Sequence, residues 1–140
     1  MEIVVPRAGL AAIEAHALET YPEECCGFLI GAEEGPTRVV GETRRAKNVH
    51  PEMRRARYTI DPRDVLAVER ELRGSPRRIL GFYHSHPDHD ATPSEYDASR
   101  AWPWYVHAIL AVRGRTAAEF RAWTFDESSG ESREVSLRVE

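Results

Sequence analysis

Apolar residues occur along this chain in short runs, some continuous and some alternating with polar residues. Short runs bounded by glycine, proline or other turn-forming residues are typical of strands, in which successive side chains point to opposite faces. The pattern predicts strand-like segments over residues 3–5, 25–30, 37–40, 58–60, 78–86, 105–112, 119–125 and 134–139. A polar, basic connection over residues 42–57 separates the first three segments from the others.

Three other segments have the spacing or the end signals of helices. The first ends before Pro22 and carries apolar residues three or four positions apart, at Leu10, Ile13, Ala17 and Tyr21. The second covers residues 62–74 and follows Asp61, a preferred N-cap, with a proline in its first turn. The third opens at Ser94 and is broken by Trp102-Pro103-Trp104. This order of elements predicts an α/β domain with a mixed sheet and a few helices.

Length and composition fit one small domain. With 140 residues, 41% of them apolar, the chain can bury a single core, so we expect one domain over residues 1–140. No run approaches the roughly 20 apolar residues of a membrane-spanning helix. The first residues lack the layout of a signal peptide, which predicts a cytoplasmic protein. The net charge of −4 argues against a nucleic-acid-binding protein.

The predicted strand that ends at Pro87 carries two residues that can bind a metal. His84 and His86 lie two positions apart, so their imidazoles point to the same side of the strand. Residues 88–93 are polar and can turn back, and Asp97, one turn into the next helix, can return its carboxylate to the imidazoles. Two histidines and a carboxylate are a ligand set for a hydrolytic zinc ion with one coordination position open for water.

Each part of this pattern also has a purely structural interpretation. Ser94 and Asp97 form the Ser-x-x-Asp pattern of a capping box at a helix N-terminus. Histidines also occur in protein cores as hydrogen-bonding groups without a metal. If Asp97 were only a cap, His89 in the polar loop would be the alternative third ligand. The presence of the strand motif and the helix motif together favours the metal site.

This set of residues resembles the signature of the JAMM (MPN-plus, Mov34/MPN/PAD-1) metalloprotease family. That signature is a glutamate at the start of an early strand, then a distant His-x-His-Pro and, after seven residues counting that proline, Ser-x-x-Asp. The family's early strand begins Glu-x-Cys-Gly, and the segment Pro22-Glu23-Glu24-Cys25-Cys26-Gly27 supplies it. Glu24 is the match and Glu23 is the neighbouring alternative. If the strand has already started there, the two carboxylates face opposite sides.

The resemblance covers essentially the whole chain and implies a fold, a cofactor and roles for five residues. It implies a single-domain JAMM/MPN fold, with a mixed β-sheet flanked by helices in a cytidine-deaminase-like layout. Zn²⁺ would be held by His84, His86 and Asp97. Glu24 would act first as general base and then as general acid, and the Ser94 hydroxyl would donate to the oxyanion of the tetrahedral intermediate.

The function implied by the resemblance is zinc-dependent hydrolysis of a peptide or isopeptide bond. This chain is close to a minimal catalytic domain and so resembles the small prokaryotic-type members of the family. Those members act at the C-terminus of ubiquitin-like, β-grasp sulfur-carrier proteins of the ThiS/MoaD type. We therefore expect a carrier with a small C-terminal adduct such as cysteine as the substrate, its extended tail paired with residues 58–60. The basic residues within 44–57 either contact an acidic carrier or are simply solvated.

The sequence leaves two other functions open. One is a non-catalytic MPN-type interaction scaffold, although scaffold members lack the ligands that are present here. The other is a ubiquitin-type deconjugating isopeptidase, although relatives of that kind carry insertions or partner domains. A zinc deaminase is not favoured, because the Pro-Cys-x-x-Cys ligand pair of that class is absent.

Overall fold

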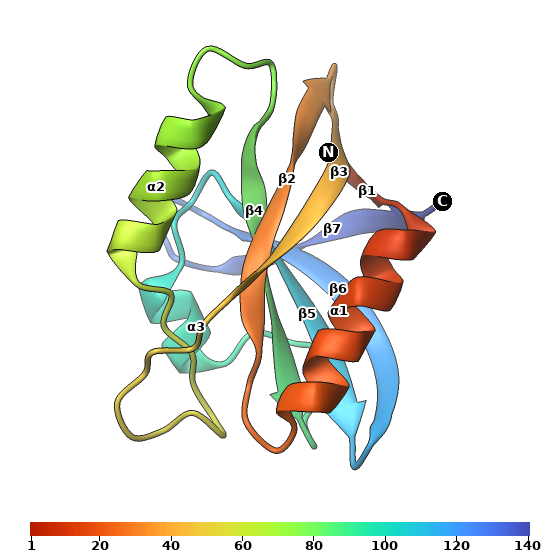
Figure 1. Ribbon diagram of the computed structural model, residues 1–140, viewed down its shortest axis with the longest axis vertical. Helices are drawn as coiled ribbons and strands as arrows, with labels where there is room; N and C mark the ends of the chain where they lie inside the picture. The colour runs from red at the N-terminus through yellow and green to blue at the C-terminus, as the bar shows by residue number, and fades with distance from the viewer.

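Nearly all of the apolar runs in the sequence form strands of one sheet. The computed structural model describes residues 1–140, and its elements in chain order are β1 (Glu2–Val5), α1 (Arg7–Thr20), β2 (Cys26–Glu34), β3 (Thr37–Ala46), α2 (Pro62–Leu72), β4 (Arg78–Pro87), α3 (Glu95–Arg100), β5 (Val106–Arg113), β6 (Thr116–Phe125) and β7 (Ser132–Val139) (Figure 1). The strand order is β1-β3-β2-β4-β5-β6-β7, and the sheet closes into a barrel because β7 also pairs with β1.

The predicted α/β architecture with a mixed sheet is confirmed. Strand β1 pairs in parallel with both β3 and β7, and β4 pairs in parallel with β5. The other neighbouring strands are antiparallel. Short turns join three of these pairs, β2 to β3, β5 to β6 and β6 to β7. The closure of the barrel was not predicted, because it depends on pairing between the first and last strands of the chain.

The helices cover opposite sides of the sheet (Figure 1). α1 contributes Ile13 and Ala17 to the main core, which receives apolar side chains from all seven strands. α2 packs on the other side against a second cluster, formed by Phe28, Ile30, Val65, Val68, Leu72, Ile79 and Phe82. α3 covers a third, smaller cluster next to β5 and β6. Strand β4 therefore contributes to both sides of the sheet, with Leu80 and Tyr83 in the main core and Ile79 and Phe82 in the second cluster.

One polar contact joins α1 to the centre of the sheet. Nδ1 of His16 is hydrogen-bonded to the Tyr83 hydroxyl over 2.7 Å, and both residues are buried. Gly27 makes room for the Tyr83 ring, because a Cβ atom at Gly27 would lie 2.3 Å from it. The glycine that closes the early strand motif therefore serves packing between β2 and β4.

The prediction of a connection over residues 42–57 is wrong at its start, since β3 continues to Ala46. The side chains in this part of β3 are polar because they pair with other surface residues. Arg44, for example, contacts both Glu42 and Glu71. A strand whose outer face is solvated in this way lacks the apolar run by which strands are predicted.

The predicted strand over residues 58–60 is absent, and this segment lies in the long loop between β3 and α2. The N–H of Thr59 donates to the side chain of Asn48. The ring of Tyr58 stacks on the imidazole of His84, with the ring centroids 4.4 Å apart. The apolar residues of segment 58–60 are therefore half-buried through contacts with the rest of the protein, not through strand pairing.

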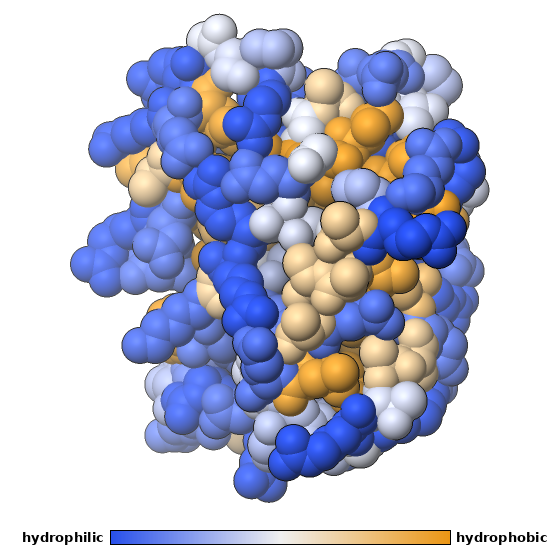
Figure 2. All heavy atoms as spheres, turned by 45° about the vertical axis from the view of Figure 1, so that its right-hand side comes forward, coloured by the Kyte–Doolittle hydropathy of each residue, from blue (hydrophilic) through white to orange (hydrophobic).

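α1 leaves a small apolar face toward solvent, in which Ala8, Ala11, Ala12 and Ala15 are exposed. Figure 2, in which α1 comes toward the viewer, shows apolar surface down the middle of this side with hydrophilic surface around it. None of the three helices has the length and hydropathy needed to span a membrane.

Candidate metal centre

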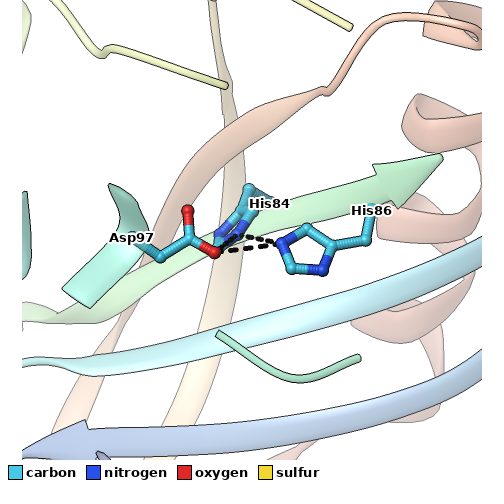
Figure 3. A group of neighbouring side chains, drawn as sticks. All are labelled: His84, His86 and Asp97. Atoms are coloured by element: carbon cyan, nitrogen blue, oxygen red, sulfur yellow. Dashed lines mark hydrogen bonds and ion pairs between the residues drawn. The ribbon is translucent and has the colours of Figure 1, made fainter. Parts of the chain in front are cut away.

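Three predicted site residues meet at the end of β4 (Figure 3). His84 and His86 project from β4 toward the N-terminus of α3, which supplies Asp97. Nε2 of His84 lies 3.1 Å from Nε2 of His86, and Oδ2 of Asp97 lies 3.3 Å and 3.0 Å from these two nitrogens. All three side chains are buried.

Local structure explains why these groups converge. β4 is paired on both sides, with β2 and β5, so the alternation of its side chains fixes both histidines on one face. The backbone N–H of Asp97 donates to Oγ of Ser94, and the backbone N–H of Ser94 donates back to the Asp97 carboxylate. The capping box is therefore present, and the carboxylate that it holds is the same one that faces the imidazoles. The structural and functional interpretations of Ser94 and Asp97 are compatible.

The hydrogen bonding of His86 favours a cation at this position. Nδ1 of His86 lies 2.7 Å from the carbonyl oxygen of Asp90, which can only accept, so Nδ1 carries a proton. In the neutral imidazole, Nε2 then presents a lone pair to the Asp97 carboxylate 3.0 Å away. Two lone pairs at this distance repel each other unless a proton or a metal ion lies between them.

The spacing of the three donor atoms fits a metal ion. Ligand atoms about 2.0–2.1 Å from a tetrahedral zinc ion lie about 3.3 Å from one another. The three donor atoms are separated by 3.0–3.3 Å. Nδ1 of His84, Oδ1 of Asp97 and Oε1 of Glu24 are buried without a hydrogen-bond partner in the protein. The buried His84, His86 and Asp97 group can therefore bind a metal.

The charge distribution is also suited to a cation. Burial raises the pKa of the Glu24 carboxyl to about 9, and the negative charge of Asp97 adds to this effect. Burial also opposes ionisation of Asp97, but His84, His86 and the N–H of Ser94 outweigh it and hold the Asp97 pKa well below its usual range. Burial lowers the pKa of His84, against the attraction of Asp97. A buried carboxylate thus faces two groups with available nitrogen lone pairs.

The two candidate glutamates have opposite environments. Glu24 is 3% exposed and lies two residues before Cys26, whose partner across the ladder is His84. The side chain of Glu23 is 40% exposed and forms an ion pair with Arg54. Because β2 begins at Cys26, this difference does not arise from strand alternation. It arises from the way the loop between β3 and α2 packs against these residues.

The other histidines do not join the group. His89, the alternative ligand, is exposed, and it is not part of the His84, His86 and Asp97 cluster that could hold a metal. His16 bonds to Tyr83 under α1, and His107 is buried beside Phe82. The contacts of His16 and His107 are those of buried packing residues.

Sequence reasoning missed the role of Tyr58, whose ring covers His84. A groove of about 280 Å³ begins at this ring and runs between the start of α2 and the segment after α3. Its apolar walls include Tyr58, Ile60, Val65, Phe82 and Trp102. No local signal in the sequence links these residues, because they come from four separate segments of the chain.

Comparison with known proteins places the chain in a family. Residues 6–126 match the family described as prokaryotic homologs of the JAB domain. A protein named desampylase from Haloferax volcanii is 38% identical over 120 residues, which cover 85% of this chain and 80% of that protein. A protein from Thermus thermophilus named "Probable TtuB-protein conjugate cleaving protease" is 34% identical over 114 residues, 79% of this chain and 73% of its own length. A CysO-cysteine peptidase from Mycobacterium tuberculosis is 32% identical over 111 residues, 77% and 72% of the two chains.

Solved structures show the same fold. A protein from Desulfitobacterium hafniense superposes with a TM-score of 0.84 at 24% identity, covering 99% of this chain and 92% of the other. A JAB1/MPN domain protein from Archaeoglobus fulgidus superposes with a TM-score of 0.61 at 20% identity, covering 99% and 96%. The chain therefore belongs to the prokaryotic JAB-domain members of the JAMM/MPN family.

Proposed function

We propose that this chain is a zinc-dependent hydrolase that cleaves a peptide or isopeptide bond at the C-terminus of a ubiquitin-like or sulfur-carrier protein. The observation that carries the proposal is the convergence of three buried donor atoms beside Glu24, a buried carboxyl without a hydrogen-bond partner. The names of the three relatives, a desampylase, a conjugate-cleaving protease and a CysO-cysteine peptidase, support this class of substrate.

Zinc is the metal that the donor set supports best. Two imidazole nitrogens and one carboxylate leave a fourth tetrahedral position open, as in catalytic zinc sites. When bound, zinc supplies a Lewis acid that polarises a carbonyl and lowers the pKa of water from about 16 to about 7. The carbonyl of Asp90 keeps the proton of His86 on Nδ1, so that Nε2 is free to bind the metal.

Glu24 is the group that would move the proton. Its carboxylate would accept a proton from the attacking water and then donate it to the departing amine. Burial and the neighbouring Asp97 raise its affinity for a proton, and no hydrogen bond inside the protein competes for Oε1. A bound cation would counter both effects and keep the carboxylate available as a base.

Ser94 would stabilise the developing negative charge. Its Oγ accepts the N–H of Asp97 through a lone pair, which leaves the hydroxyl hydrogen free to donate. A hydroxyl in this position beside the metal ligands can donate to the oxyanion of the tetrahedral intermediate.

The groove that begins at Tyr58 supports binding of an extended tail. A slim tail, ending in glycines, can bring its last carbonyl to the metal, and the apolar walls can hold the side chains that precede it. Residues 58–60 form no strand, so tail binding by strand pairing at this segment is not supported. The contacts would instead be made by side chains.

The alternative of a non-catalytic scaffold has no specific observation in its favour, because the ligand set and Glu24 are all present and buried together. The nature of the leaving group is a separate question. The connections around the site contain no helix or strand that could grip a second folded protein, so we expect a small adduct such as cysteine to leave faster than a folded protein from an isopeptide bond.

The first part of the test is metal content. Purified protein, reconstituted with zinc, should contain about one zinc ion per chain by elemental analysis. His86→Ala should lose the metal, while His89→Ala, which removes an exposed histidine from the adjoining loop, should keep it. A wild-type protein that binds no zinc after reconstitution would contradict the proposal.

The second part uses the same zinc-loaded protein and mass spectrometry. One substrate is a β-grasp carrier with an added C-terminal cysteine, and the other is the same carrier joined to a lysine side chain. Cleavage of either after the last glycine supports the hydrolase, and faster loss of cysteine supports the small leaving group. If both substrates stay intact, the proposed function is wrong; if only the isopeptide is cut, the chain is a deconjugating isopeptidase.

A further inference from the structure

Asn48, in the loop between β3 and α2, uses all four hydrogen bonds that an asparagine side chain can make. Its Nδ2 donates to the carbonyl oxygens of Glu24 and Arg57, each over 3.0 Å. Its Oδ1 accepts the backbone N–H groups of His50 and Thr59, each over 3.1 Å. One side chain thus joins both ends of the loop to the backbone of Glu24.

The backbone of Glu24 depends on this loop. Glu24 precedes β2, so no strand ladder holds it. Its N–H donates to the carbonyl of Arg54 over 2.7 Å, and its carbonyl accepts from Asn48. Both backbone groups are therefore bound by residues of the same loop.

The carboxylate of Glu24 has no hydrogen bond of its own that would fix its position. Its position relative to the metal ligands therefore follows from its backbone and from the packing around it. A displacement of about 1 Å in a reacting group can reduce a rate by about 10²-fold. A group that holds the backbone of Glu24 can therefore affect turnover without contacting the substrate.

We propose that Asn48 is a positioning residue for Glu24. It holds the carbonyl of Glu24 and, through the same amide nitrogen, the carbonyl just before Tyr58, the residue that covers His84. This inference rests on the proposed function of Glu24 as the proton-transferring group. It concerns the rate of the chemical step, so it predicts a change in kcat and not in substrate binding.

Two variants separate this role from a general effect on the loop. Asn48→Asp is nearly isosteric and keeps the acceptor for His50 and Thr59, but it cannot donate to the two carbonyls. Asn48→Ala removes all four bonds without adding a charge. The matched control is Arg54→Met, which removes the bond from Arg54 to the His50 carbonyl and the ion pair with Glu23, but leaves the backbone of Glu24 bound.

The experiment measures kcat and KM for the zinc-loaded proteins on the carrier substrate that the wild type cleaves. Both Asn48 variants should lose at least about tenfold in kcat with KM within about twofold. Zinc content of Asn48→Asp should stay near one per chain, and Arg54→Met should stay near wild type in both constants. If the wild type cleaves nothing, the proposed function has failed, and the role of Asn48 in it fails as well.

A second readout does not depend on activity. In metal-free protein, Asn48→Asp should speed hydrogen exchange of the Glu24 amide at least about tenfold, measured by NMR, while amides in the centre of β5 are unchanged. If the Asn48 variants keep kcat within twofold, or if Arg54→Met loses as much as they do, Asn48 is not a positioning residue. If Asn48→Ala does not fold, Asn48→Asp decides the question alone.

Discussion

At the scale of single residues, Glu23 and Glu24 differ more than their adjacency suggests. Glu23 is partly solvated and paired with Arg54, whereas Glu24 is buried next to Asp97 and has an oxygen without a partner. A buried carboxyl with neither a salt bridge nor a hydrogen bond is costly to keep. Its presence beside a group that can bind a metal is therefore typical of a functional site.

The first prediction separates the base from the ligands. Glu24→Gln should keep zinc and the fold but lose nearly all turnover, because the amide has almost the same shape and cannot accept a proton. Zinc analysis and kcat on the carrier substrate check this. Glu23→Gln is the control and should stay active. Loss of activity in Glu23→Gln instead would show that Glu23 is the base.

The second prediction concerns Ser94, which has a structural and a proposed chemical role. Ser94→Ala should lower the free energy of unfolding by about 0.5–2 kcal/mol, because the cap on Asp97 is lost. It should also lower kcat by at least about tenfold with zinc retained, because the oxyanion donor is lost. Ser94→Thr keeps the hydroxyl and should be close to wild type in both respects. A destabilised variant with unchanged kcat would leave Ser94 as a cap only.

The convergence of His84, His86 and Asp97 could be predicted from the sequence because its geometry is local. Strand alternation places His84 and His86 on one face, and Asp97 follows one turn into a helix whose start is marked by Ser94. Glu24 could be identified only through the family resemblance, because no residue near it in the sequence indicates that it lies close to the histidines. Tyr58 could not be predicted, because its stacking on His84 exists only once the loop has packed.

At the scale of elements, the loop of residues 47–61 is as important to the site as the strands. It has no regular structure, yet it binds the backbone of Glu24 and places Tyr58 on the ring of His84. Nδ1 of His84 has no hydrogen bond to set its orientation, in contrast to His86 with the Asp90 carbonyl. Stacking by Tyr58 therefore replaces the usual hydrogen bond from outside the ligand set.

The third prediction follows from this replacement. Tyr58→Ala should weaken zinc binding by about tenfold or more, because loss of an outer partner typically costs 10–100-fold in affinity. Tyr58→Phe keeps the stacked ring and should bind zinc as the wild type does. Titration of metal-free protein with zinc against a competing chelator measures both. Equal affinities for all three proteins would show that the stacking does not orient His84.

Elements with a strong apolar pattern were predicted within a few residues of their observed bounds, whereas three segments were not. β2 and β3 extend beyond their apolar runs, to Glu34 and Ala46, because polar side chains continue the pairing on the solvated face. Residues 58–60 have the composition of a strand but form no ladder, and their one backbone–backbone hydrogen bond runs from the N–H of Val49 to the carbonyl of Thr59. Composition indicates which side chains can be buried, but it does not indicate which other residues they pack against.

At the scale of the whole molecule, His16 connects α1 to the middle of the barrel through its bond to Tyr83, and the burial of its imidazole makes stability depend on pH. Burial lowers the pKa of His16 from 6.5 to about 4, with Arg45 acting in the same direction and Glu19 against it. Between these values the unfolded chain takes up a proton that the folded protein does not. The contribution of neutral His16 to the free energy of unfolding is therefore complete above about pH 6.5 and is lost as the pH falls toward 4.

The fourth prediction tests this dependence. The free energy of unfolding of the wild type should fall as the pH is lowered from 6.5 to 4, with at most about 3 kcal/mol from His16. His16→Gln should show a smaller fall; part of the slope remains because burial also lowers the pKa of His107 to about 4. Denaturant titrations with a chelator present, so that metal release does not contribute, measure both. Parallel curves for the two proteins would contradict the assignment.

The position of β5 in the closed sheet has a consequence for how the protein is inactivated by heat. Residues 106–112 are seven buried residues without a formally charged side chain, hydrogen-bonded to β4 on one side and β6 on the other. A stretch with this composition, apolar except for one histidine and free of proline, is typical of segments that start aggregation once exposed. While the barrel is intact, this segment is inaccessible. Heating should therefore inactivate the protein irreversibly, at a speed set by the rate of unfolding and not by the folding equilibrium.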